Sequence, residues 1–520
     1  MAVRLQGVGM LTTLRSFRDS RSGNYAMMLA ALMPAIFGAV GFAVDLGTIG
    51  HARSQLQQSL DSAVLAASRI GDESESRQAV FDAYMAANVA GFVELANVEA
   101  TLEVDRGANY ISTTGHARAE VQLYIPYLFG ETRYVSVTSN AYQSTDRLEI
   151  VMVLDNTGSM GVARMASLRS AATALVDILS TVKSPEREVF AALVPFVTAV
   201  NVKGTGFKSS WIDTSALSSH HGANFDLVAG KKVNHFDLFT RLGVEWKGCV
   251  EARPGIHART DTPPDPSDPD TLFVPYFAPD EPGSARFSGD SGTGFNNSYL
   301  DETTGGAQLA QQRSTGKYSS ATFRRINETG PLTTGPNYAC PTPIVPLTQD
   351  LNALKGEIAK MIHWNGSGTN VSEGLAWGLR VLSPGEPYTE GKPFEAGDVS
   401  KHVVVFTDGE NNVFGASNEA INKSDYGSYS FVDQGRMGTT SRSAALTNVN
   451  TWTRDLCTDL KRKGVQIHTV MLGADTAANR ALYSSCASRP DNYYPMSDVS
   501  ELENVFRRIA ANITRLSVTN

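Results

Sequence analysis

The sequence predicts an α/β protein: a doubly wound, mostly parallel sheet with a long insertion, preceded by one N-terminal transmembrane helix and a small α+β segment. Three patterns carry this prediction. An uncharged apolar run lies near the N-terminus, a stretch of alternating polar and apolar residues follows, and strand and helix patterns then alternate to the end of the chain. The 520 residues are 42% hydrophobic and 19% charged, a composition that builds packed domains and excludes a wholly disordered chain.

Residues 26–44 carry no charge and predict a transmembrane helix. As a helix this run spans about 28 Å, close to the hydrocarbon thickness of a bilayer. The charged residues before it are mostly basic, so the positive-inside rule predicts a cytoplasmic N-terminus (residues 1–25) and an exported remainder. A cleaved signal peptide, a buried core helix and a prepilin-type cut after Gly23 are the alternatives. The charged residues before the run are Arg4, Arg15, Arg18, Arg21 and Asp19.

Residues 45–146 predict a small unit of helices and strands. Leu56, Leu60 and Val64 recur at helical spacing, which indicates that the N-terminal helix continues beyond the membrane. This stripe serves either packing within the unit or pairing with a similar helix of another subunit. Residues 97–144 alternate between polar and apolar side chains in β-rich segments, and they predict a small sheet packed on helices within residues 72–90.

Residues 147–520 predict the doubly wound domain. The segments LEIVMVLD (148–155) and HVVVFTD (402–408) are almost continuously apolar, as is typical of strands buried on both faces of a parallel sheet. Helical patterns follow both of them, and the last helix falls at residues 499–513. Strand and helix patterns that alternate in this way are typical of an open parallel sheet with helices on both faces.

Residues 201–342 interrupt the alternation and predict an insertion. Its middle, residues 261–283, is too rich in Pro and Asp for regular elements. A calcium loop fits poorly, because prolines replace the glycine turn and no glutamate closes a twelve-residue loop. We expect a solvated, partly ordered segment, parts of which pack on the domain. The aromatic residues expected to pack there are Trp211, Phe273, Tyr276 and Phe277.

Oxygen-bearing side chains gather where the predicted strands end, at the sheet edge that binds ligands in open α/β proteins. One group follows the first buried strand, a second lies in the glycine loop 365–369 before a helix, and a third ends the strand at 402–408. None is His or Cys, so the set suits a hard six-coordinate cation, Mg²⁺ or Mn²⁺. Turn residues alone also produce such segments, but three in order favour a metal site. The five predicted donors are Asp155, Thr157, Ser159, Thr369 and Asp408.

This donor pattern resembles the metal-ion-dependent adhesion site of von Willebrand factor type A domains. The resemblance implies that Thr157, Ser159 and Thr369 bind the ion directly, and that Asp155 and Asp408 act largely through water molecules. It also implies one open coordination position for an Asp or Glu carboxylate of a protein partner. The family usually has serine at the position of Thr157, a difference that keeps the hydroxyl group and adds a methyl group.

Nearly the whole chain, except for the insertion, resembles the TadE/TadG-like pilus-assembly proteins of bacteria. The resemblance rests on residues 23–26 (GNYA), on the helix after them and on the segment ARSQLQQSLDSAVLAAS. The segments SGTNVSEGLAWGLRVLSP and CASRPDNYYPMSDVSELENVFRRIA resemble TadG-type members as well. The resemblance implies anchoring in the inner membrane, an A-type domain in the periplasm, and a role with other components in assembling or secreting Flp-type pili.

The four cysteines predict two disulfides, because an exported domain meets an oxidising compartment. Cys457 and Cys486 lie on predicted helices that flank one strand, which favours the pair Cys457–Cys486. The remaining pair, Cys249–Cys340, would then tie the ends of the insertion. Three pairings are open in principle, and isolated buried thiols are the other alternative.

The net charge and the lack of known catalytic motifs in the sequence limit the classes of function that we expect. The net charge of −8 argues against nucleic-acid binding, which needs a basic surface. The sequence contains no G-x-S-x-G, H-E-x-x-H or Walker motif, so an enzyme is not expected. We expect a membrane-anchored periplasmic protein-binding module that depends on a divalent metal. The alternatives are a structural anchor or surface adhesin with a vestigial metal site and, from another class, a metal-dependent hydrolase. Residues 410–412 either line the ligand face or are simply solvated.

Overall fold

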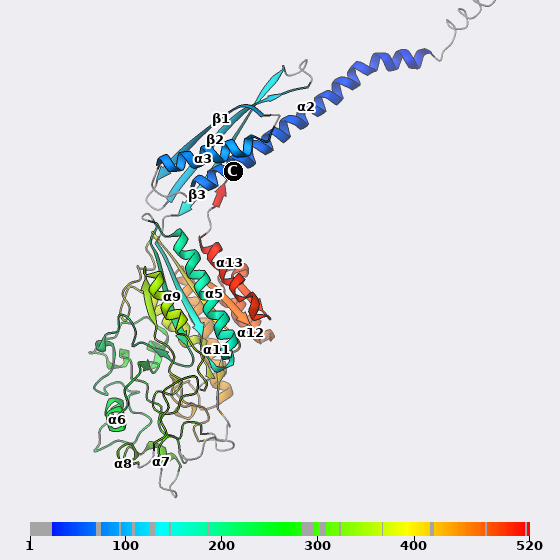
Figure 1. Cartoon of the computed structure of the whole chain (residues 1–520). Coiled ribbons are helices and arrows are strands. Elements are labelled where there is room, and N and C mark those ends of the chain that lie inside the picture. Colours follow the sequence, from blue (N-terminus) through cyan, green and yellow to red (C-terminus); the bar gives the residue numbers. More distant parts are fainter. Residues whose placement is uncertain are drawn as a thin grey trace, which may run out of the picture. The chain divides into compact units, whose positions relative to one another are not determined.

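The structure, a computed structural model (Figure 1), describes most of the chain. The described residues form two compact units, one made of residues 23–144 with 517–519 and the other of residues 147–514. Each unit has a hydrophobic core of its own. The described ranges are 23–68, 74–92, 95–106, 110–124, 130–144, 147–184, 187–282, 295–301, 308–321, 324–366, 368–415, 421–473, 476–514 and 517–519. Most of the N-terminal segment predicted to be cytoplasmic, including its arginines, and Ser367 therefore lie outside the described residues.

Helix α2 (Gly23–Ser68) is continuous from the apolar run into the first unit, which confirms the predicted continuation. Its N-terminal half is largely uncovered: Met27, Leu29 and Phe37 are between 56% and 68% exposed. From Ala52 onward one face of the same helix is fully buried, because its small and aliphatic side chains pack on a sheet.

The first unit pairs two helices with an antiparallel sheet. Alternate side chains of the strands, among them Ala117, Ala119 and Val137, join the core with Leu60 and Phe81 of the helices. The strand order is β1-β2-β3-β14, so the C-terminal strand β14 pairs with β3 in this unit, although the predicted second domain extended to residue 520. The elements besides α2 are α3 (Ser74–Val89), β1 (Leu95–Arg106), β2 (Tyr110–Gln122), β3 (Thr132–Ser144) and β14 (Ser517–Thr519).

The second unit is built on a six-stranded sheet of order β13-β12-β10-β4-β5-β8. Neighbouring strands are parallel except for β8, which runs antiparallel at one edge. This confirms an α/β architecture with a mostly parallel sheet. The strands are β4 (Arg147–Asp155), β5 (Val189–Phe196), β8 (Val345–Thr348), β10 (Val399–Thr407), β12 (Gln466–Leu472) and β13 (Tyr493–Met496).

Helices cover both faces of this sheet. Along β4, Ile150 and Met152 point into a core with α5, α9 and α13, whereas Val151 and Val153 point into a core with α10, α11 and α12. Because both faces are buried, the strand is apolar almost throughout. The helices are α5 (Gly161–Val182), α9 (Leu351–Ala359), α10 (Val371–Leu382), α11 (Arg442–Arg462), α12 (Ala477–Cys486) and α13 (Leu502–Thr514).

The insertion between β5 and β8 is more buried than predicted. Its four predicted aromatic anchors are at most 1% exposed, but residues 271–282 are also buried, so the expectation of a solvated segment is wrong there. The burial is tolerated because the backbone is paired: the N–H of Phe273 donates to Trp211 O and that of Tyr276 to Cys249 O, both at 2.9 Å. The short elements are β6 (Val200–Asn201), β7 (Cys249–Val250), α6 (His235–Leu242), α7 (Gln308–Arg313) and α8 (Lys317–Ser320).

A second excursion, residues 408–441 between β10 and α11, was not recognised in the sequence. Its strand β11 (Asn412–Val413) pairs with β9 (Gly368–Thr369), and its Tyr426 packs on Tyr276 of the insertion with ring centroids 4.9 Å apart. Short 3-10 turns complete the unit: Gly158–Met160, Ser209–Trp211, Gly255–Arg259, Pro269–Thr271, Val432–Gln434, Pro490–Asn492 and Val499–Glu501.

Both predicted disulfides are present. Cys249–Cys340 links β7, inside the insertion, to the C-terminal end of the insertion, and Cys457–Cys486 links α11 to the end of α12. The favoured pairing is therefore confirmed.

Candidate metal site

Asp155 ends strand β4 at the centre of the sheet and is completely buried. Its Oδ1 accepts a hydrogen bond from the Thr157 N–H at 2.8 Å, and its Oδ2 accepts one from the Thr407 hydroxyl, also at 2.8 Å. Thr407 ends the neighbouring parallel strand β10, so the two strands together hold the carboxylate in one orientation.

Burial and then the charge of nearby Asp408 raise the pKa of Asp155 to about 7. Hydrogen bonds from Thr157 and Thr407 oppose this rise without cancelling it. A buried carboxylate of this kind gains stability from a cation placed beside it, because the cation favours the ionised form.

Three further predicted donors form a chain of oxygen atoms. The hydroxyl oxygens of Thr157 and Ser159 are 3.0 Å apart, and Ser159 donates to Oδ1 of Asp408 at 2.7 Å. With metal–oxygen bonds of 2.0–2.1 Å, neighbouring ligands of an octahedral Mg²⁺ lie about 3.0 Å apart. The spacing and the all-oxygen chemistry of these donors therefore fit Mg²⁺ or Mn²⁺.

The outer oxygen of Asp408 has a partner that the sequence did not reveal. Arg164, in the first turn of α5, donates from Nη1 to Oδ2 of Asp408 at 2.7 Å. The side chain of Asp408 is 2% exposed and that of Arg164 is 44% exposed, so the ion pair reaches from the buried site to solvent.

Thr369, the fifth predicted donor, lies in β9 and pairs with Asn412. The positive φ of Gly368 (+95°), together with a collision between any Cβ and the Asn412 carbonyl, requires glycine before it. The preceding loop lies against the loop after β4, because the Trp364 N–H donates to Asn156 O at 2.8 Å. Among the described contacts, no hydrogen bond joins the Thr369 side chain to the other four donors, so its part in the site stays a prediction.

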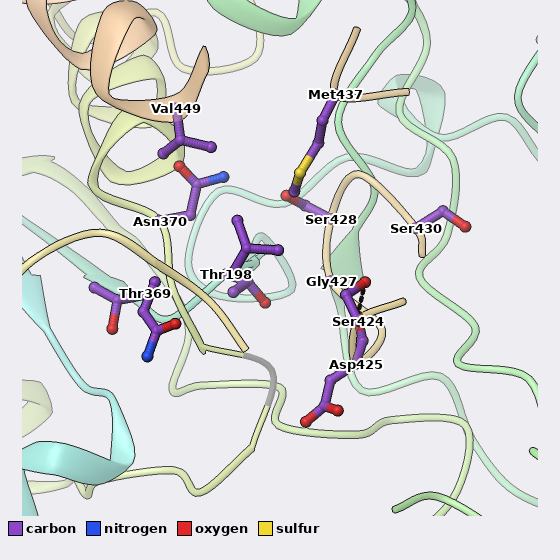
Figure 2. A pocket seen from close by; sticks show the side chains of 12 residues that line it. Thr198, Thr369, Asn370, Ser424, Asp425, Gly427, Ser428, Ser430, Met437 and Val449 are labelled. Carbon is purple, nitrogen blue, oxygen red and sulfur yellow. Dashed lines mark hydrogen bonds between the residues drawn. The ribbon is translucent and has the colours of Figure 1, made fainter. Parts of the chain in front are cut away.

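A small pocket lies next to Thr369. Figure 2 shows Thr369 and Asn370 on one side of it and residues 424–430 of the second excursion on the other. Several lining residues carry hydroxyl, amide or carboxyl groups, but Val413, Met437 and Val449 also line the pocket, and its surface is mainly apolar. The second excursion therefore forms one wall of a small, largely apolar pocket beside the β9 strand.

The segment after Asp408 is only partly available to a ligand. Glu410 and Asn412 are exposed, but Asn411 is fully buried, contrary to both readings of this residue from the sequence. Its Oδ1 accepts from the Val371 N–H at 2.8 Å and its Nδ2 donates to Asn450 Oδ1 at 2.9 Å. Asn411 therefore fixes the start of α10 rather than facing a ligand.

The described part of the chain holds no cluster of three or more His, Cys, Asp or Glu side chains that could bind a metal. The candidate site instead combines two carboxylates with hydroxyl groups. At such a site a hard cation would be bound by two charged carboxylates and several neutral hydroxyl oxygens. It would also keep some of its water ligands.

Residues 23–71 match a family model described as putative Flp pilus-assembly TadE/G-like. The match covers helix α2 and the three residues after it. A search of curated proteins finds no match.

Several solved structures are similar at low identity. The pilus adhesin SpaC from Lactobacillus rhamnosus GG, in an open conformation, is 11% identical with a TM-score of 0.30 over 80% of this chain and 34% of SpaC. The vWF domain of the type V pili tip protein Mfa5 from Porphyromonas gingivalis is 12% identical with a TM-score of 0.30 over 71% of this chain and 95% of that domain.

The pilus adhesin RrgA from Streptococcus pneumoniae is 11% identical with a TM-score of 0.35, over 82% of this chain and 50% of RrgA. The chain thus spans about a third of SpaC and half of RrgA. The TM-scores of all three structures are low.

Proposed function

We propose that this chain is a membrane-anchored protein-binding module whose second unit is a von Willebrand factor A-type domain. Mg²⁺ or Mn²⁺, held by the five predicted donors, mediates the binding. The observation that carries the proposal is the chain of oxygens from Thr157 through Ser159 to Asp408, with separations of 3.0 and 2.7 Å, beside the buried Asp155. The donors are Asp155, Thr157, Ser159, Thr369 and Asp408.

A bound divalent cation would supply the positive charge that holds an Asp or Glu carboxylate of a protein partner. The chain's own residues prepare this position. Asp155 is held by two hydrogen bonds, and Ser159 is exposed, so a partner reaches the site from solvent. In the proposed role, each of the five donors binds the cation or holds another of its ligands in place. The arrangement supports binding rather than catalysis.

The exposed apolar half of α2 supports the membrane anchor. Asp45, the first charged residue after the run, is buried and accepts a hydrogen bond from the Tyr124 N–H at 2.9 Å. The folded unit thus begins at Asp45 and leaves residues 27–44 for a bilayer. Helix α5 also has the length and composition of a span, but 44% of that window is buried inside the second unit.

We further propose that the anchor spans the bacterial inner membrane with the N-terminus in the cytoplasm and both units in the periplasm. The two disulfides agree with an oxidising compartment. The family match over residues 23–71 supports a role in assembly or secretion of Flp/Tad-type pili, with other components of that machinery as partners.

The test is pilus assembly in the host strain with Ser159→Ala, which removes a donor without changing the fold. Ser180→Ala is the control, since Ser180 lies in α5, outside the five predicted donors, and its hydroxyl donates to the Asp177 carbonyl at 2.6 Å. We expect Ser159→Ala to abolish surface pili and Ser180→Ala to keep them. Normal piliation of Ser159→Ala would favour a structural anchor with a vestigial metal site. Turnover of a substrate lost in the same variant would favour a hydrolase.

A further inference from the structure

We propose that Arg164 is a second cation that binds the partner's carboxylate beside the metal ion. The inference rests on the proposed function and adds a residue to it. It starts from the ion pair between Arg164 Nη1 and Asp408 Oδ2 at 2.7 Å, which joins a buried acid of the metal site to a side chain that reaches solvent.

The ion pair and the metal site use different oxygens of Asp408. Oδ1 accepts from Ser159 at 2.7 Å, on the side of the predicted donors, whereas Oδ2 accepts from Arg164. A cation beside Ser159 therefore leaves the Arg164 ion pair intact. With a cation bound beside Ser159, both positive charges would adjoin the Asp408 carboxylate.

Arg164 has N–H donors that its described contacts do not use. A guanidinium group carries five N–H donors in a planar fork that matches a carboxylate. The described contacts of Arg164 use one of them, toward Asp408, and the side chain is 44% exposed. An incoming carboxylate would thus meet a partly exposed guanidinium group that is paired with an acid of the metal site.

The expected effect of Arg164 on carboxylate binding follows from the net charge of the metal-loaded site. With a divalent cation bound and both Asp155 and Asp408 ionised, the charges of metal and ligands cancel. Arg164 then leaves the loaded site with a net positive charge, which attracts an anionic group. Without Arg164 the loaded site would be neutral, and a carboxylate would gain only its direct bond to the metal.

The experiment uses the full chain in detergent micelles with Mn²⁺ as the metal and acetate as the carboxylate probe. Mn²⁺ binding is followed by electron paramagnetic resonance. Acetate binding is followed by the paramagnetic relaxation of its carboxyl ¹³C at constant ionic strength. The variants are Arg164→Gln, Arg164→Lys and the control Arg169→Gln. Arg169 lies on the same helix, but its guanidinium donates to the Met361 carbonyl at 2.8 Å instead of a metal-site acid.

We expect Arg164→Gln to weaken acetate binding about tenfold, the effect of losing a charged hydrogen bond, while Mn²⁺ still binds. Arg164→Lys keeps the charge and should recover part of the affinity, and Arg169→Gln should match the wild type. Melting curves in chelator show whether each variant is folded.

Two results would overturn the inference and leave the proposed function standing. One is unchanged acetate affinity in Mn²⁺-loaded Arg164→Gln. The other is loss of Mn²⁺ itself in folded Arg164→Gln, which would reduce Arg164 to a residue that positions Asp408. A wild-type chain that binds no Mn²⁺ would instead contradict the proposed function.

Discussion

The hydroxyl of Ser159 donates a 2.7 Å hydrogen bond to Oδ1 of Asp408, a residue 249 positions further along the chain. The two meet because β4 and β10 are parallel neighbours, with Leu154 in register with Phe406, so that their carboxyl ends share one edge of the sheet. Arg164 compensates the charge of Asp408, whereas the described hydrogen-bond donors to the buried Asp155, from Thr157 and Thr407, are neutral. This imbalance has a consequence for stability.

Without metal, the ionisation of Asp155 should destabilise the folded chain. Its pKa is about 7 in the folded state against an ordinary value of 3.8, so the stabilisation from the protonated carboxyl group is full below pH 4 and is lost as the pH rises through 7. In chelator, lowering the pH from 7.5 to 5.5 should stabilise the wild type relative to Asp155→Asn by roughly 2 kcal/mol. Chemical denaturation of both proteins at the two pH values measures this difference. A difference that does not change with pH would contradict the assigned environment of Asp155.

Gly368 should be required for the β9–β11 pairing that carries Thr369. Its φ of +95° and the approach of the Asn412 carbonyl exclude a side chain. Gly368→Ala should cost about 1–3 kcal/mol of stability and weaken Mn²⁺ binding at least about tenfold. The control is Gly356→Ala in α9, where a Cβ meets nothing within 4 Å, and this variant should be neutral or slightly stabilised. Equal Mn²⁺ affinity in Gly368→Ala and the wild type would remove Thr369 from the site.

The two disulfides should differ in their contribution to stability. Cys249–Cys340 spans 91 residues and Cys457–Cys486 spans 29. On the loop-entropy model, replacing the first pair by serines costs about 4.6 kcal/mol and replacing the second about 3.6 kcal/mol. Denaturant unfolding measures the free energy of unfolding of the two double variants and so shows which disulfide contributes more stability. A larger loss for Cys457→Ser/Cys486→Ser would mean that local packing, not loop closure, decides their effect.

The apolar half of α2 should hold the chain in the membrane. Ile36 and Phe37, which are 49% and 63% exposed, lie near the middle of the run. Changing both to arginine costs about 2.5–3.5 kcal/mol per residue in a bilayer. The double variant should be released by alkaline carbonate extraction, whereas Val104→Arg, at an exposed position of β1, should stay in the membrane pellet. Retention of the double variant would argue against a spanning helix.

The sequence predicted what depends on local pattern. The buried strands β4 and β10 were visible as apolar runs, and their parallel pairing brings Asp155, Thr157, Ser159 and Asp408 together as expected. Both disulfides followed from the helices that carry one pair.

The features that could not be predicted from the sequence depend on contacts between residues that are far apart in the chain. From the sequence, Arg164 is expected to be a solvated residue in the first turn of a helix. Only the folded structure shows that its partner is Asp408, 244 positions away. Residues 271–282 read as solvated because of their Pro and Asp content, yet Trp211 and Cys249 supply their backbone partners. From the sequence, Asn411 is expected to be a loop residue. Its buried hydrogen bonds are evident only in the structure, where α10 and α11 supply the partners.

The metal site is tested most directly by titrating the full chain with Mn²⁺ in detergent and counting bound ions by electron paramagnetic resonance. The proteins are the wild type, Ser159→Ala and the control Ser180→Ala. We expect one bound Mn²⁺ per wild-type chain, the same for Ser180→Ala, and affinity at least about tenfold weaker for Ser159→Ala, since one direct ligand is lost. A wild-type chain that binds no Mn²⁺, or a Ser159→Ala chain that binds it equally well, would contradict the proposed metal site.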